Sequence, residues 1–139
     1  MFELIKKFEG FAEHAYECPA GVVTIGYGTT FYPDGTLVKM GDTITQKQAE
    51  DCLMWYCTNR IKLPRGMFTE NQKEALYSVI YNIGQGAFDK SNCKKAIEAE
   101  NWKLAYKEWN WVKANGKVLN GLIKRRQAEK ELFFEGLNI

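Results

Sequence analysis

Residues 9–28 read EGFAEHAYECPAGVVTIGYG, and this stretch is the centre around which the rest of the chain is interpreted. It places a carboxylate (Glu9), a thiol (Cys18) and a hydroxyl (Thr24) in a segment whose pattern changes from helix to strand. Most of the remaining sequence has the periodicity of plain amphipathic helices. Any chemistry is therefore expected in this stretch.

The residues before the stretch predict the environment of Glu9. Leu4, Ile5 and Phe8 have the spacing of a short amphipathic helix, and Gly10 would end it. Glu9 then lies in the last turn, where the negative end of the helix dipole disfavours the ionised carboxylate. A carboxyl group that stays protonated near neutral pH suits a general acid.

The second half of the stretch predicts a sheet. The run 22–30, VVTIGYGTT, is rich in β-branched residues, and a turn at 33–35 separates it from Leu37-Val38-Lys39. This pattern predicts a small antiparallel sheet of two or three strands. Gly26 and Gly28 would leave one face of the strand bare, so that a ligand or another backbone approaches closely; a hairpin with bulges is the alternative.

Beyond Gly41 the sequence predicts helices. Two capping boxes, Thr45 with Gln48 and Thr69 with Gln72, mark the starts of two of them. The first runs to about residue 61, and the second, to residue 83, has the composition of a buried central helix. Further helices are expected after the N-caps Ser91 and Asn101 and over residues 119–135.

Two features of the C-terminal half have a structural and a functional interpretation. The tryptophans at 102, 109 and 111 fit core packing, with a sugar-stacking platform as the alternative. The basic run Lys124-Arg125-Arg126 on the last helix is typical of a solvated face.

Composition narrows the classes of function. The chain has 139 residues, 45% of them hydrophobic, which is enough for one domain with a buried core. A net charge of +2 does not argue for a nucleic-acid partner. The four cysteines have no CxxC spacing, so we expect free thiols, three of them in the core, and no metal site or disulfide.

Neither a secretory signal peptide nor an apolar run of the roughly 18 residues that span a bilayer is apparent. We therefore expect no stable membrane insertion, and export either by another route or through a segment outside this sequence. The free thiols favour synthesis in a cytoplasm.

Three classes of function remain open on the residues alone. Glu9 suits the acid of a glycosidase, with Cys18 and Thr24 holding a water. Cys18 with His14, the only histidine, would make a thiol hydrolase, although no third group stands out to orient His14. A glycan-binding module without catalysis is the third class.

The residues also resemble a known family. Glu9, Cys18 and Thr24, followed directly by Ile25-Gly26-Tyr27-Gly28, resemble the active-site signature of the phage-type lysozymes, the endolysins of glycoside hydrolase family 24. The run 76–84 with Gly86, Phe88 and Ser91 is similar to the family's central helix and following loop. The run 121–129, GLIKRRQAE, is similar to its C-terminal G-L-x-x-R-R-x-x-E segment.

The resemblance implies an α+β lysozyme fold in a single catalytic domain, 1–139, with a small β lobe at about 15–40. The helical lobe is expected at about 41–139 together with the N-terminal helix. The implied reaction is hydrolysis of the β-1,4 bond between N-acetylmuramic acid and N-acetylglucosamine in peptidoglycan, by a monomer, without cofactor or metal. The setting is a host bacterium, where the enzyme is made in the cytoplasm and acts on the wall in lysis.

The resemblance also implies roles for single residues. Glu9 takes the general-acid position and Thr24 that of a group that hydrogen-bonds the catalytic water. Four further residues fall where the family lines its cleft: Thr30, Tyr81, Asn82 and Ser91. Family analogy also suggests that Arg125 or Arg126 pairs with Glu9.

Cys18 stands where many members have aspartate and some have cysteine. A thiol of ordinary pKa is mostly neutral at pH 7, so it is a poorer base than a carboxylate but a better nucleophile once ionised. Both a water-based, inverting mechanism and a thiol adduct are open at this point. Thr29 also departs from the family, where many members have histidine.

Overall fold

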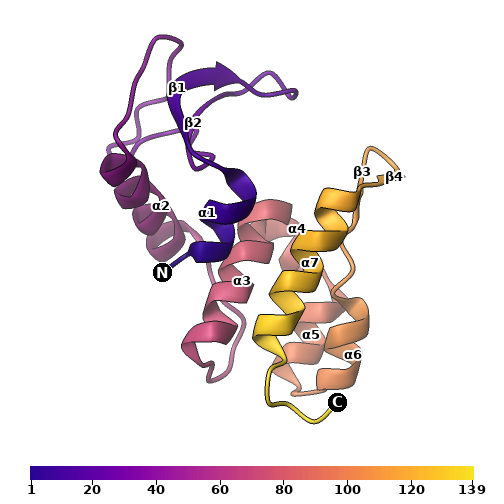
Figure 1. The fold of residues 1–139 in the computed structure, drawn as a ribbon. Helices are drawn as coiled ribbons and strands as arrows, with labels where there is room; N and C mark the ends of the chain where they lie inside the picture. The colour runs from indigo at the N-terminus through magenta and orange to yellow at the C-terminus, as the bar shows by residue number, and fades with distance from the viewer. The chain divides into compact units, whose positions relative to one another are not determined.

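The computed structural model describes all 139 residues, which form seven helices and two small antiparallel sheets (Figure 1). This content confirms the predicted α+β class. The contacts divide the chain into two compact units, Phe2–Arg60 and Ile61–Ile139, the latter with Met1. The prediction that 1–139 acts as a single catalytic domain stays a prediction. None of the helices combines the length and the apolar character needed to cross a membrane.

The first unit holds α1 (Glu3–Glu9), β1 (Ala12–Glu17), β2 (Val23–Gly26) and α2 (Gln46–Arg60). As predicted, α1 ends at Gly10, which has φ 72° and donates its N–H to the Lys6 carbonyl at 3.0 Å. The Thr45–Gln48 capping box is also confirmed, because each side chain bonds the other's backbone N–H, at 3.0 and 3.1 Å. Lys6 and Glu50 join α1 to α2 at 2.7 Å.

The sheet of this unit has two strands, and its first strand was not predicted. β1 pairs with β2 in the register Ala12↔Gly26, Tyr16↔Thr24 and Glu17↔Val23, with an irregularity between Ala12 and Tyr16. The expected strand over 22–30 is therefore too long. It ends at Gly26, and 37–39 contributes only one bridge, Phe31↔Leu37.

The two glycines of this region serve a turn, which corrects the expectation of a bare strand face. Ile25 and Thr29 exchange backbone hydrogen bonds of 2.9 and 2.8 Å around residues 26–28. Gly26 and Gly28 have φ values of 64° and 91°, which L side chains rarely adopt. A Cβ on Gly26 would lie 3.0 Å from that of Ala49, so α2 is the neighbour that requires glycine there.

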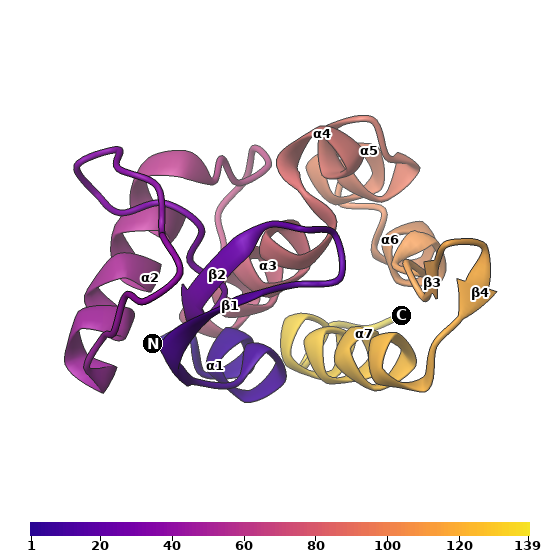
Figure 2. The ribbon, with the colours of Figure 1, turned by 90° about the horizontal axis from the view of Figure 1, so that it is seen from above.

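The second unit holds five helices and a short hairpin. These are α3 (Glu70–Ile83), α4 (Gln85–Asp89), α5 (Asn92–Glu98), α6 (Trp102–Glu108), β3 (Lys113–Ala114), β4 (Lys117–Val118) and α7 (Asn120–Phe133). In both ribbon views α3 lies beside α7, and α5 lies beside α6 (Figures 1 and 2). The predicted N-caps are confirmed at Thr69, Ser91 and Asn101.

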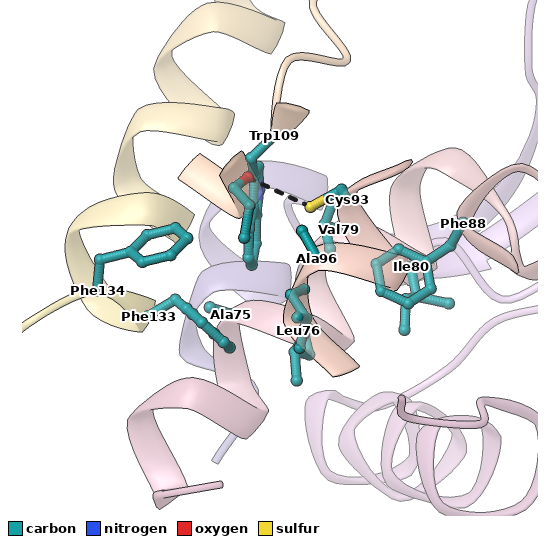
Figure 3. Packing of buried hydrophobic residues seen from close by; sticks show 12 residues of the cluster. Ala75, Leu76, Val79, Ile80, Phe88, Cys93, Ala96, Trp109, Phe133 and Phe134 are labelled. Carbon is teal, nitrogen blue, oxygen red and sulfur yellow. Dashed lines mark hydrogen bonds between the residues drawn. The ribbon is translucent and has the colours of Figure 1, made fainter. Parts of the chain in front are cut away.

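The core of the second unit forms where α3, α5, α6 and α7 meet (Figure 3). Val79 and Ile80 are buried on α3, which confirms it as a core helix. Trp109 is fully buried and packs against the rings of Phe133 and Phe134, at centroid distances of 5.2 and 5.6 Å. The core-packing interpretation is thus confirmed for this tryptophan.

The buried helix α3 yields a stability prediction. Val79→Asp places an unpaired charge at a fully buried position, so we expect a loss of more than about 4 kcal/mol and an unfolded protein at room temperature. Asn71→Asp puts the same residue at an exposed position in the first turn of α3, where the helix dipole favours it, and should leave the melting temperature unchanged or slightly higher. Circular dichroism melts compare the two; equal melting curves would contradict the core assignment.

Candidate active site

Cys18 begins a tight turn between β1 and β2. Its N–H donates to the Val22 carbonyl at 2.9 Å, and its own carbonyl accepts from Gly21 N–H at 2.8 Å. Gly21 has φ 81°, which explains a glycine at this point of the turn. The turn leaves the Cys18 side chain half-buried.

Hydrogen-bonding groups of the turn act on the Cys18 thiol. The N–H of Val22 contributes most, followed by that of Ala20, and the Thr24 hydroxyl adds a smaller contribution; together they lower the pKa of the Cys18 thiol against the opposing effect of burial. Two of the three predicted catalytic residues are held at the same point of the turn, because Cys18 N–H and the Thr24 hydroxyl both donate to the Val22 carbonyl, at 2.9 and 3.1 Å. These groups stabilise the thiolate form of Cys18 relative to an ordinary cysteine.

Thr24 is a buried residue of β2, with 6% of its surface exposed. Its hydroxyl lies 3.1 Å from the Val22 carbonyl, to which it donates. The hydroxyl has one proton, so a bond to the Val22 carbonyl or to the Cys18 sulfur leaves the oxygen lone pairs to accept from a third group. This geometry suits a residue that holds a water beside Cys18.

Glu9 is the last residue of α1 and is half-buried. Only Gly10 and Phe11 separate it from Ala12, which pairs with Gly26 on β2. Phe11 packs on Tyr27, with ring centroids 5.6 Å apart, and so fixes the link between helix and sheet. Glu9 and Thr24 are therefore carried by one helix–hairpin element.

The other thiols and the histidine do not share these features. Burial raises the pKa of the Cys52 thiol and takes those of Cys57 and Cys93 to about 12. The prediction of three core cysteines is therefore confirmed. His14 is exposed on β1 and forms a bridge to Thr43, and it is not among the groups that shift the pKa of Cys18.

In the second unit, a groove of about 610 Å³ follows the end of α3. Its lining includes two amides, an indole and an ammonium group, from Asn82, Asn110, Trp111 and Lys113. Amide and aromatic side chains are suited to hydrogen bonding and stacking with sugars. Asn82 was predicted from the sequence, whereas Asn110 and Lys113 were not. The third tryptophan, Trp111, was noted only as a possible part of a sugar platform.

The remaining predicted cleft residues have mixed surroundings. Ser91 caps α5: its hydroxyl donates to the Phe88 carbonyl at 2.6 Å and accepts from Lys94 N–H at 3.1 Å. Tyr81 is half-buried in the last turn of α3. Thr30, in the first unit, is half-buried, and its carbonyl accepts from Val38 N–H at 3.1 Å. Their roles toward substrate stay predictions.

The basic run on α7 is not a solvated face, so that prediction is wrong for two of its three residues. Arg126 is buried and donates to both carboxylate oxygens of Glu129, at 2.7 and 2.9 Å. Arg125 is buried as well, and it donates to the Ser78 hydroxyl and carbonyl at 3.3 and 3.2 Å. Only Lys124 is exposed. The suggested pairing of one arginine with Glu9 stays a prediction.

Comparison with known proteins gives concordant results. The family model described as phage lysozyme matches residues 6–129. An endolysin of Acyrthosiphon pisum secondary endosymbiont phage 1 is 41% identical over 94% of this chain and 92% of its own length. Two solved structures are similar to this chain over 99% of its residues. The endolysin from Escherichia coli O157:H7 phage FAHEc1 has a TM-score of 0.81 at 35% identity, and the match covers 92% of its chain. The muramidase domain of SpmX from Asticaccaulis excentricus has a TM-score of 0.79 at 34% identity over 95% of its chain. The lysozyme-like fold is thereby confirmed.

The donors around Cys18 predict its reactivity. Iodoacetamide should alkylate this thiol with a pH midpoint below that of an ordinary cysteine, because its hydrogen bonds stabilise the thiolate. Thr24→Val removes one of these donors and should move the midpoint upward. Mass spectrometry of the labelled peptide provides the measurement. Cys57 and Cys93 serve as internal controls, since burial keeps both protonated and covered. Faster labelling of either, or a midpoint at the ordinary value, would contradict this account.

The Glu129 network predicts a large difference between two neighbouring carboxylates. Glu129→Ala leaves two buried guanidinium groups without their shared carboxylate and should cost about 3–5 kcal/mol. Glu131→Ala changes the same residue type at an exposed position on the same helix and should be nearly silent. Urea unfolding measures both, and similar midpoints would show that the network contributes little.

Proposed function

This chain belongs to the phage lysozyme family, and from that premise we propose that Glu9, Cys18 and Thr24 hydrolyse the β-1,4 bond between N-acetylmuramic acid and N-acetylglucosamine. The family assigns the activity: the chain is a lysozyme of the glycoside hydrolase class, a muramidase that degrades bacterial peptidoglycan in host lysis. The observation that supports the residue roles best is that Cys18 N–H and the Thr24 hydroxyl both donate to the Val22 carbonyl, which holds the two residues together in the turn after β1.

The proposed reaction needs a proton donor and an activated water. Glu9 gives its proton to the glycosidic oxygen as the bond to the leaving sugar breaks. The water is held by the Thr24 oxygen and by the Cys18 thiolate, which takes up a proton from it as the water attacks the anomeric carbon. Direct attack by water on the opposite face inverts the anomeric centre.

The lowered pKa of Cys18 supports this assignment. A neutral thiol is a weak hydrogen-bond acceptor, whereas a thiolate is a good one and a usable base. Donors in the turn raise the thiolate fraction of Cys18 and so reduce the main disadvantage of cysteine at this position, which is that an ordinary thiol is mostly neutral at pH 7. Direct attack by the sulfur on the sugar is the alternative chemistry for the same thiolate.

In the second unit we assign the groove at Asn82 to peptidoglycan. Its amides match the hydrogen-bonding groups of N-acetyl sugars, and Trp111 offers a ring for stacking. Tyr81, Ser91 and Thr30 are retained as further binding residues on the family resemblance alone. We further propose that the enzyme acts as a monomer, without a nucleic-acid partner, and that it is made in the host cytoplasm before it reaches the wall.

Two rival functions have less support. A Cys–His thiol hydrolase needs His14 beside Cys18, and His14 is absent from the groups that act on the sulfur. An inactive glycan-binding module would not need a turn that stabilises a thiolate.

The roles are tested by turbidity clearing of permeabilised bacteria. Glu9→Gln keeps the shape of the side chain but removes the acid, so activity should fall by about 10²-fold or more while the fold is kept. Cys18→Asp should retain substantial activity, because a carboxylate accepts the same hydrogen bond from water, and Cys18→Ala should lose most of it. His14→Ala should have near-normal activity.

Three outcomes would revise the assignment. Near-normal activity of Glu9→Gln would exclude it as the acid. Inactivity of both Cys18→Asp and His14→Ala, with intact folds, would favour thiol chemistry. Binding of peptidoglycan without clearing by the unaltered protein would favour the binding module.

A further inference from the structure

The charges of the chain are distributed unevenly between the two units. Residues 2–60 hold five Lys and Arg against eight Asp and Glu, whereas residues 61–139 hold fourteen against nine. The net charge of +2 is therefore the sum of about −3 on the first unit and +5 on the second unit. Within this unit, residues 109–128 contain five basic residues and no acidic one.

Three of these five basic residues are exposed. Arg125 and Arg126 are buried with Glu129, which leaves Lys113 and Lys117 on the hairpin and Lys124 on α7. Neither Lys117 nor Lys124 forms an ion pair, whereas several lysines elsewhere do, among them Lys6, Lys47 and Lys94. Their charges are thus available to an outside partner.

Apolar side chains are exposed among these lysines. The whole run 113–121 is exposed, and within or beside it lie Val118, Leu119 and Ile123, with 53%, 44% and 39% of their surface accessible. Leu119 and Ile123 are neighbours at the start of α7, because the Ile123 N–H donates to the Leu119 carbonyl at 3.1 Å. Ile123 also lines a shallow hollow of about 290 Å³ with Tyr106 and Val112.

Leu119 is moreover a poor choice for the position it occupies. It is the N-cap of α7 and makes no side-chain cap hydrogen bond. Leucine is among the least favourable residues at an N-cap, where serine, threonine, aspartate or asparagine would accept a backbone N–H. Leucine at this N-cap position lowers helix stability and exposes an apolar side chain, and a residue with both effects fits a role in binding.

We propose that this surface, formed by Lys117, Val118, Leu119, Ile123 and Lys124, binds the surface of an anionic phospholipid bilayer. Lysines beside exposed aliphatic side chains match the charged headgroups and the apolar layer beneath them. A purely polyanionic partner, such as a phosphate-rich wall polymer, uses the lysines but gives the aliphatic groups no apolar partner. Binding is peripheral and reversible and does not involve the Cys18 turn.

Sedimentation with vesicles tests the proposal on the whole chain. Vesicles of equal parts phosphatidylglycerol and phosphatidylcholine should bind the protein at low salt and release it at high salt, while pure phosphatidylcholine should bind little. Lys117→Gln with Lys124→Gln should weaken binding roughly 25-fold, at about fivefold for each lysine. Lys90→Gln with Lys95→Gln removes the same charge from exposed positions of the same unit and should have little effect.

Leu119→Ser examines the apolar part independently of charge. Serine is the better N-cap, so the melting temperature should stay or rise while vesicle binding falls. Hydrolysis of soluble peptidoglycan fragments should be unchanged in all these variants, because none of the altered residues lines the groove at Asn82.

Absence of binding to the phosphatidylglycerol vesicles at low salt would overturn the proposal, and so would either of two further results. One is equal loss of binding in the surface and control lysine pairs. The other is normal vesicle binding by Leu119→Ser together with equally tight binding of soluble polyphosphate, which would assign the lysines to a polyanion.

Discussion

The second unit depends on the burial of one carboxylate, Glu129. Its oxygens accept from Arg126 at 2.7 and 2.9 Å, from the Trp109 indole at 3.1 Å and from the Ser78 hydroxyl at 2.6 Å. These partners come from α7, from α3 and from the segment after α6. A buried ion is tolerated only when nearly all of its hydrogen-bonding capacity is used, so the network fixes how these three segments meet. The orientation of Arg125 follows, since it shares Ser78 and lies 3.5 Å from Glu129.

Local rules predicted the elements whose cause is local. Thr45 and Thr69 start helices because each side chain meets a backbone N–H three residues later, and this information lies within four residues of sequence. Gly10 and Gly84 end helices for an equally local reason. The strand β1 had no such signal. Its sequence AEHAYE is mostly polar, and its conformation is imposed by pairing with Val23–Gly26.

The burial of Arg125 and Arg126 shows why a run of basic residues in the sequence does not always predict a solvent-exposed face. The spacing of Arg126 and Glu129 on one helix is visible in the sequence, but such a pair is usually exposed. Burial here depends on Ser78, which lies 47 residues before Arg125, and on the Trp109 indole. Among the candidate site residues, the family signature indicated Cys18 and Thr24. It did not indicate the N–H groups of Ala20 and Val22, because almost every residue type has a backbone N–H and the sequence does not show where that group points.

Those backbone donors also explain how cysteine can stand where many family members have aspartate. A carboxylate is ionised at neutral pH without assistance, whereas a thiol needs stabilisation of its anion. Hydrogen bonding from the N–H groups of Val22 and Ala20 lowers the pKa of the thiol at residue 18, and donors of this kind stabilise a carboxylate as well. A carboxylate is anionic at neutral pH and a thiol is mostly neutral. The backbone of the turn therefore restores part of the anionic character that is lost when cysteine replaces aspartate. The remaining difference is that sulfur is the larger and more nucleophilic atom, so a thiolate at this position is able to attack a carbon centre as well as to accept a proton.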